Sequence, residues 1–169
     1  MIQKKICMLG SFAVGKTSLI ARFVRSIFSA KYLTTVGVKI DRKAIHVDDK
    51  EVNLVLWDLH GDDEYQRIRV SYLRGASGYF LVADGTRSAT LDHALILNRE
   101  TRSQLGEVPF ILLLNKDDLT EEWEVGDDAL DELKGQEIPV IRTSAKTGQN
   151  VERAFEELTR KMLSADGRD

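Results

Sequence analysis

Glycine, lysine and threonine residues near the start of the chain are spaced in a way that can hold phosphate groups. The segment 10–17 reads Gly, four residues, Gly-Lys-Thr, between the apolar run 6–9 and a helical pattern of apolar residues. In such a loop, backbone N–H groups converge at a helix start and attract anions. Lys16 is expected to reach the β- and γ-phosphates, and Thr17 to offer its hydroxyl to Mg²⁺. An ordinary glycine-rich turn is the alternative, but the flanking strand and helix favour a nucleoside triphosphate site.

A second polar segment, 115–118, predicts which base is bound. It reads Asn-Lys-Asp-Asp and follows the apolar run 110–114, at the carboxyl end of an expected strand, where open α/β sheets bind ligands. An ionised Asp118 has two adjacent acceptors that match the N1–H and 2-amino donors of guanine, and adenine has no such pair. Lys116 is expected to lay its aliphatic stem over the base. Residues 143–146, after the next strand, could bring a backbone N–H to the guanine carbonyl oxygen.

Two further segments predict contacts with a metal ion and a γ-phosphate. Asp58 ends an alternating strand, where a carboxylate can hold Mg²⁺ through water, and Gly61 lets a backbone N–H approach the γ-phosphate. Thr35 lies in a region with little periodicity, and its hydroxyl is expected to complete the magnesium shell only while the γ-phosphate is present. Such a segment would be ordered in one nucleotide state and loose in the other.

Strand-like and helix-like segments alternate from end to end, which predicts an α/β fold with a mostly parallel sheet. Continuously apolar runs are typical of buried parallel strands, and they occupy 6–9, 79–83, 110–114 and 138–141. Residues 38–57 instead alternate apolar and polar side chains across a turn at 48–50, which predicts a hairpin with one antiparallel edge strand. The apolar face of residues 151–162 predicts a last helix, with Asn150 as its N-cap.

Length and composition are those of a small globular protein. Residues 1–169, of which 43% are hydrophobic and 30% charged, are expected to form one domain. The net charge of −3 gives no reason to expect a nucleic-acid partner. The single cysteine, Cys7, is predicted to be a buried thiol in a reducing, cytoplasmic setting. We find no membrane span and no lipid-anchor cysteine near the C-terminus, so no intrinsic membrane anchor is expected.

With these segments in place, the chain resembles the Ras superfamily of small GTPases, most closely its Rab-like branch, over essentially all of residues 2–163. The matching segments are 10–17, Thr35, 58–61, 115–118 and 144–146, together with 32–38, which looks like the first switch of Rab proteins. The resemblance implies a phosphate-loop NTPase fold of three α/β/α layers, whose six-stranded, mostly parallel sheet has one antiparallel edge strand and is flanked by five helices. It also implies a GTP/GDP switch that recruits effectors in its GTP state. The missing anchor cysteine favours a prokaryotic member.

The resemblance also assigns roles to individual residues. Contacts with GTP or GDP are expected from Gly10, Ala13, Val14, Gly15, Lys16, Thr17, Ser18, Phe28, Asn115, Lys116, Asp118, Ser144, Ala145 and Lys146. The expected Mg²⁺ ligands are Thr17, Thr35 and Asp58, and the residues expected to act in hydrolysis are Lys16, Thr35, His60, Gly61 and Asp62. An effector, an exchange factor and a GTPase-activating protein are expected to bind a monomer through 28–40 and 58–75.

Departures from the family pattern fall in the catalytic centre. Asp62 occupies the position of the glutamine that usually orients the attacking water, and it brings negative charge without an amide donor. Phe12 stands where a small residue is common and would crowd an incoming arginine, and Ala13 could restrict the loop. We therefore expect intrinsic hydrolysis at or below about 10⁻⁴ per second. His60, which replaces an alanine, is the competing candidate to position water.

Two functions of different classes remain open at this point. The first is a slow GTPase switch, and the second is a pseudo-GTPase scaffold that holds GTP or GDP permanently. The complete set of γ-phosphate-sensing residues favours the switch, because a scaffold would not need it. Phe12 and Asp62 keep the scaffold open.

Overall fold

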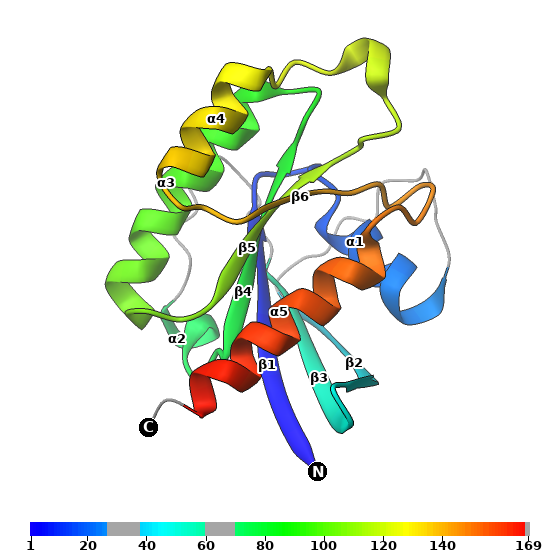
Figure 1. Ribbon diagram of the computed structural model, residues 1–169, viewed down its shortest axis with the longest axis vertical. Coiled ribbons are helices and arrows are strands. Elements are labelled where there is room, and N and C mark those ends of the chain that lie inside the picture. The colour runs from blue at the N-terminus through cyan, green and yellow to red at the C-terminus, as the bar shows by residue number, and fades with distance from the viewer. Residues whose placement is uncertain (27–37, 60–69, 168–169) are drawn as a thin grey trace.

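A six-stranded sheet forms the middle of the molecule in a computed structural model that describes residues 1–26, 38–59 and 70–167 (Figure 1). The strands are β1 (Ile2–Gly10), β2 (Val38–Val47), β3 (Lys50–Leu59), β4 (Gly78–Asp84), β5 (Phe110–Asn115) and β6 (Val140–Arg142). The helices in these ranges are α1 (Lys16–Arg25), α2 (Val70–Leu73), α3 (Ser88–Leu105), α4 (Asp127–Gly135) and α5 (Val151–Asp166), with a short 3₁₀ turn, η1 (Thr120–Glu122). In the same ranges, no helix has the length and hydropathy needed to cross a membrane.

The strands lie in the order β2-β3-β1-β4-β5-β6. Each neighbouring pair is parallel except β2 and β3, which form the predicted hairpin at the edge of the sheet. The turn residues Asp48 and Asp49 have φ angles of 50° and 64°, and two left-handed residues suit the twist of a two-residue hairpin loop. The predicted fold is therefore confirmed, with its five helices found in the described part of the chain.

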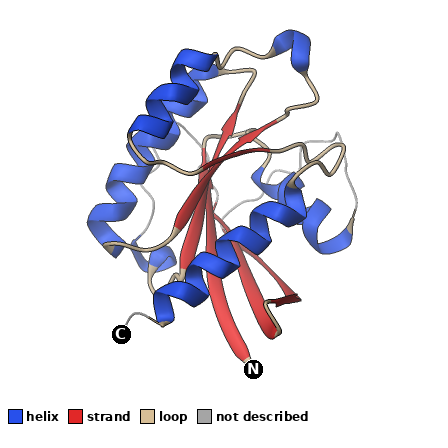
Figure 2. Cartoon of the chain, in the orientation of Figure 1, coloured by secondary structure: helices blue, strands red, loops and turns tan. Residues whose placement is uncertain are grey.

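Helices cover both faces of the sheet, with α1 and α5 on one face and α2, α3 and α4 on the other (Figure 2). Side chains alternate across a strand, so β1 supplies both hydrophobic cores. Ile6 and Met8 belong to the core with α1 and α5, whereas the predicted buried thiol, Cys7, belongs to the core with α3. Phe23 of α1 stacks on Phe155 of α5, with ring centroids 3.8 Å apart. Full burial of a side chain of this kind contributes about 1.5–3 kcal/mol, so α1 is held firmly where it follows β1.

Two local predictions need correction. The strand expected at 138–141 begins at Val140, because Ile138 donates its N–H to Leu133 of α4 and Pro139 has no N–H to donate. Asn150 does precede α5, but its side chain makes no capping bond to that helix. Its Nδ2 instead donates to the carbonyl oxygen of Arg142 at 2.8 Å, which ties the start of α5 to the end of β6.

Candidate functional site

The predicted phosphate loop joins β1 to α1 and has an unusual backbone. Ala13, which we expected to restrict the loop, has a φ of 65°, and Gly15 has a φ of 107°. A Cβ atom at Gly15 would lie under 3.0 Å from Nδ2 of Asn115, so only glycine fits there. Gly15 is the N-cap of α1, and no side chain caps that helix start. The first N–H groups of α1 are therefore available to an anionic ligand.

The ammonium group of Lys16 is buried in this loop. Its Nζ donates to the carbonyl oxygens of Gly10 at 2.9 Å and Ser11 at 3.2 Å. Burial lowers the pKa of Lys16, and the carboxylate of Asp58 opposes that shift. The net shift is still downward, so Asp58 does not fully compensate the burial of this cation, and a phosphate group would add the missing negative charge. The loop therefore suits a polyphosphate.

Two of the three predicted magnesium ligands are in direct contact. The hydroxyl of Thr17 donates to Oδ2 of Asp58. Asp58 lies on β3 opposite Met8 of the neighbouring parallel strand β1, which leads directly into the phosphate loop. Asp58 is 1% exposed, and its Oδ1 accepts no hydrogen bond from the residues that the structure describes. A buried carboxylate oxygen without a partner fits a hydrated Mg²⁺ in this position.

Asn115, at the end of β5, connects the phosphate loop to the loop after β6. Its Nδ2 donates to the carbonyl oxygen of Val14 at 3.0 Å. Its Oδ1 accepts from the hydroxyl of Thr143 at 3.1 Å and from the backbone N–H of Ala145 at 3.3 Å. Because the side chain is buried, these bonds are sheltered from competing water. One amide group thus holds three segments of the predicted site together.

The predicted base-reading carboxylate is held by the loop after β6. Ser144 donates its hydroxyl to Oδ1 of Asp118 at 2.7 Å. That loop is held in turn by Arg22 of α1. Its Nε donates to the carbonyl oxygen of Ala145 at 2.8 Å, and a terminal nitrogen of its guanidinium donates to the carbonyl oxygen of Lys146. The structure therefore brings the predicted base-binding residues to the same edge of the sheet as the phosphate loop.

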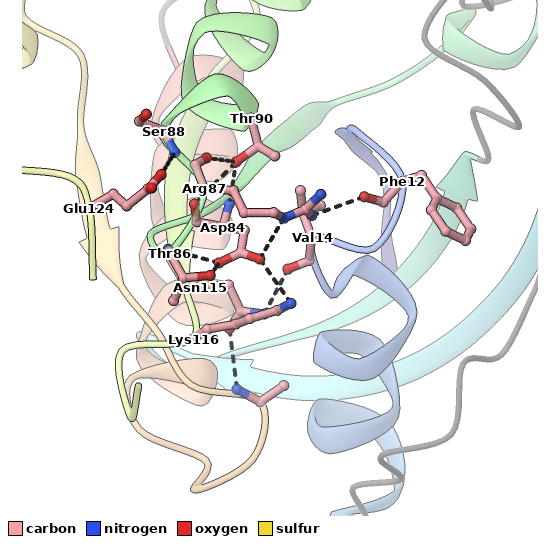
Figure 3. A network of polar contacts seen from close by, with 11 residues as sticks. Phe12, Val14, Asp84, Thr86, Arg87, Ser88, Thr90, Asn115, Lys116 and Glu124 are labelled. Carbon is pink, nitrogen blue, oxygen red and sulfur yellow. Dashed lines mark hydrogen bonds and ion pairs between the residues drawn. The ribbon is translucent and has the colours of Figure 1, made fainter. Parts of the chain in front are cut away.

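Sequence reasoning missed Asp84, a buried carboxylate at the end of β4 (Figure 3). Thr86 donates to its Oδ1 from its N–H and its hydroxyl, and both Arg87 and Lys116 donate to its Oδ2. Burial raises the pKa of Asp84, but the bonds from Thr86, Lys116 and Arg87 outweigh it and hold that pKa below its ordinary value. One signal was available in the sequence, because Asp84 directly follows the apolar run 79–83 just as Asn115 follows the run 110–114. In the structure the two residues are register partners on β4 and β5.

Five predicted site residues lie outside the described residues, and they are Phe28, Thr35, His60, Gly61 and Asp62. Phe12 is described and is 45% exposed on the phosphate loop. In the parts of the chain that the structure describes, no cluster of three or more His, Cys, Asp or Glu side chains could hold a metal ion. The candidate metal position therefore rests on the contact between Thr17 and Asp58 and on the Oδ1 of Asp58, which is unbonded among the described residues, and not on such a cluster.

Several known proteins are similar to this chain in sequence. A sequence model of the Ras family matches residues 5–164. The chain is 35% identical to the Ras-related protein Rab11A of Lotus japonicus over 153 residues, which cover 89% of this chain and 68% of that protein. It is 34% identical to the Ras-related protein RABA4d of Arabidopsis thaliana, with 98% and 79% covered. It is also 34% identical to the Ras-related protein YPTC6 of Chlamydomonas reinhardtii, with 91% and 72% covered.

Proposed function

This chain belongs to the Ras family, with Rab proteins among its relatives, and on that premise we propose that it is a magnesium-dependent GTPase switch with slow intrinsic hydrolysis. Family membership makes it a GTP-binding switch that hydrolyses GTP. The magnesium ion, the residue roles and the slow rate are our proposals. The observation that best supports the residue roles is the bond from Asn115 to Val14, which joins the phosphate loop to the base-binding segments. Neither the described residues nor the relatives specifically favour a non-hydrolysing scaffold.

Recognition of guanine is assigned to Asp118. Its carboxylate would accept from the N1–H and 2-amino groups of the base, and adenine, with an acceptor at N1, would face it with a lone pair. The hydroxyl of Ser144 occupies one side of Asp118 Oδ1, which fixes the direction of the carboxylate before a ligand arrives. Lys116 would cover the base with its aliphatic stem, because its ammonium group is held by Asp84 at 2.9 Å. Preorganisation of this kind reduces the entropy lost on binding.

The phosphate groups and the metal ion are assigned to the other half of the site. Lys16 and the first N–H groups of α1 would bind the β- and γ-phosphates. Thr17, Asp58 and Thr35 would hold Mg²⁺, and the free Oδ1 of buried Asp58 supports that assignment among the described residues. Bound magnesium would neutralise charge on the phosphate oxygens as the γ-phosphate leaves. To bind the metal, the hydroxyl of Thr17 would exchange its hydrogen bond to Asp58 for a contact with Mg²⁺.

Slow hydrolysis is assigned to the residue types at two positions. Asp62 stands where a glutamine would orient the attacking water, and a carboxylate there repels the phosphate oxygens and has no N–H to donate. Phe12 is exposed on the phosphate loop, where its ring would meet an arginine supplied by an activating protein. His60 is the residue that would take over the positioning of water if it turned inward.

Regulators and effectors are proposed to bind through residues 28–40 and 58–75. The described part of this surface includes Ile40, a large apolar side chain on the edge strand β2 that is 46% exposed. Ile40 is the register partner of Trp57 on β3, whose ring lies 6.4 Å from that of Tyr72. An exposed apolar group beside aromatic rings is typical of a protein-binding surface.

Single-turnover hydrolysis on the purified, GTP-loaded protein tests the proposal. We expect wild type to hydrolyse GTP at or below about 10⁻⁴ per second and Asp62→Gln to be faster. Asp63→Gln, with the same change of charge at the neighbouring acid, is the matched control and should not be faster. A wild-type rate near about 10⁻² per second would contradict slow hydrolysis. A loss of at least about tenfold in His60→Ala would move the positioning of water to His60.

A further inference from the structure

The guanidinium group of Arg87 connects the phosphate loop to the end of β4. Its Nε donates to Oδ2 of Asp84 at 3.0 Å, and its terminal NH2 nitrogen donates to the carbonyl oxygen of Phe12 at 3.1 Å (Figure 3). A planar guanidinium with several fixed donors can bridge two acceptors in this way, and a lysine ammonium on a flexible stem holds such a geometry less well. Arg87 therefore bonds directly to the phosphate loop from a different part of the chain.

The same carboxylate oxygen of Asp84 also holds Lys116, whose Nζ lies 2.9 Å away. Asp84 is 1% exposed, so its two cationic partners interact with it in a region of low dielectric constant, where charged hydrogen bonds are strong. The backbone links the same segments, because Gly85 donates its N–H to the carbonyl oxygen of Asn115 at 3.0 Å. Phe12, Arg87, Asp84 and Lys116 form a continuous chain of contacts from the phosphate loop to the base-binding segment.

The backbone of Arg87 is itself fixed at the start of α3. Thr90 donates its hydroxyl to the carbonyl oxygen of Arg87 at 2.7 Å, and Arg87 donates its N–H to the carbonyl oxygen of Asp84 at 2.9 Å. The side chain of Arg87 is 46% exposed, and an exposed ion pair contributes little by itself. Here the acceptor is buried and the donor starts from an anchored backbone, so the bridge has a defined geometry.

We propose that Arg87 is a positioning residue that couples the phosphate loop to the base-binding segment through Asp84 and thereby sets how long a guanine nucleotide stays bound. The inference rests on the nucleotide site proposed above. Arg87 itself touches neither the base nor the γ-phosphate in this account. Loss of its side chain would remove the bond from Arg87 to the carbonyl group of Phe12 and leave Lys116 as the remaining cation on Asp84. Both halves of the site would then open more independently, and the nucleotide would leave faster.

The release rate of a fluorescent GDP analogue from the loaded protein tests this inference. Arg87→Ala is expected to release it about 10-fold faster, the effect typical of losing a hydrogen bond to a charged group. Arg87→Lys, which can reach one acceptor but not both, should lie between Arg87→Ala and wild type. Arg102→Ala is the matched control, because Arg102 lies on α3, the helix that Arg87 precedes, and forms a surface ion pair with Glu107. It should release the analogue at the wild-type rate.

A second background separates coupling from a general loss of structure. Asp84→Asn keeps the shape of the side chain but removes its charge. Adding Arg87→Ala to this variant should change the release rate of the GDP analogue less than about 2-fold, because the effects of coupled residues are not additive. Single-turnover GTP hydrolysis by Arg87→Ala should stay near wild type, and its melting temperature at saturating GDP should fall only by the few degrees that about 10-fold weaker binding costs.

Equal release from Arg87→Ala and wild type, or full additivity with Asp84→Asn, would overturn the coupling. A drop in hydrolysis with unchanged release would also overturn it, because Arg87 would then act on the phosphates. Failure of wild type to bind GDP at all would instead reject the nucleotide site on which the inference rests.

Discussion

The side-chain amide of Asn115 donates to the backbone carbonyl of Val14 at 3.0 Å across 101 positions of sequence. Through this bond the segment that is expected to read the base holds the loop that is expected to bind phosphate. The oxygen of the same amide accepts hydrogen bonds from the hydroxyl of Thr143 and the backbone N–H of Ala145, which belong to a third segment. A nucleotide spanning these segments would therefore find their relative positions already set, which favours tight binding.

Replacement of Asn115 by alanine should weaken both the fold and the binding of nucleotide. The variant leaves three buried polar partners without their bonds, so its free energy of unfolding should fall by about 2–4 kcal/mol, and GDP release should accelerate. Urea unfolding and the release of a fluorescent GDP analogue measure the two effects. Asn98→Ala is the control. Asn98 is a buried residue of α3, away from the phosphate loop, and its side chain accepts a hydrogen bond from the hydroxyl of Tyr79 at 2.7 Å. Asn98→Ala should lower the free energy of unfolding and leave the rate of GDP release unchanged. Similar acceleration of GDP release in both variants would refute a special role for Asn115.

Replacement of Gly15 by alanine should distort the phosphate loop. The new methyl group would overlap Nδ2 of Asn115, and the φ of 107° is strained for any side chain. We expect a loss of about 2–3 kcal/mol in stability and GDP affinity at least about 10-fold weaker. Gly135→Ala is the control, since a Cβ there has open space at the end of α4. Thermal melts with and without GDP would show the difference, and equal behaviour of the two variants would argue against the close approach of Gly15 to Asn115.

Replacement of Asp118 by asparagine should change which base is preferred. An amide loses the pair of acceptors for guanine but gains an NH₂ donor for the carbonyl group that xanthine carries at position 2. GTP affinity should fall by about 100-fold, and xanthosine triphosphate should bind better than GTP. Competition titration with both nucleotides measures the preference. Asp117→Asn, at the neighbouring acid that pairs with Arg142 at 2.7 Å, should keep the preference for GTP. A retained preference in Asp118→Asn would place guanine recognition elsewhere.

The thiol of Cys7 should report global unfolding. Burial raises the pKa of Cys7 to about 12, against an opposing effect of Lys5. At pH 8 the native thiol stays neutral and unreactive, so an alkylating reagent should label it only in denaturant. Because the folded pKa exceeds the ordinary value of 9.0, this group destabilises the fold only as the pH rises above 9.0, and it has no effect near neutrality. Cys7→Ala should lose less stability than wild type between about pH 9 and pH 11. Rapid labelling of the native protein at pH 8 would show that the thiol is accessible.

The predictable part of the fold came from periodicity. Continuous apolar runs predicted the buried parallel strands because both faces of such strands are covered by helices, and alternation predicted the half-exposed hairpin. The proximity of Lys16, Thr17 and Asp58 was predictable because strand-ending motifs meet at one edge of a parallel sheet. Phe28, Thr35 and Asp62 stay predictions from sequence.

The remaining features depend on tertiary contacts that no spacing encodes. Asp84 and Arg87 lie in an unremarkable Asp-Gly-Thr-Arg segment, and their importance appears only when the register sets Asp84 beside Asn115. The start of β6 was missed because an apolar residue such as Ile138 looks the same whether its N–H bonds to a strand or to the end of α4. Asn150 is a good capping residue by type, but it has a φ of 59° in place of the extended backbone of a capping residue, and its Nδ2 donates to the carbonyl oxygen of Arg142.

A nucleotide chase tests whether this chain is a magnesium-dependent switch selective for guanine nucleotides. The protein is loaded with a fluorescent GDP analogue and chased with excess GTP or ATP, each with and without a magnesium chelator. We predict that GTP displaces the analogue, that ATP does not, and that chelation accelerates the release at least about 10-fold, because Thr17 and Asp58 lose the metal that helps to hold the phosphates. Equal displacement by ATP would contradict selectivity for guanine, and a release rate that the chelator leaves unchanged would contradict a bound magnesium ion.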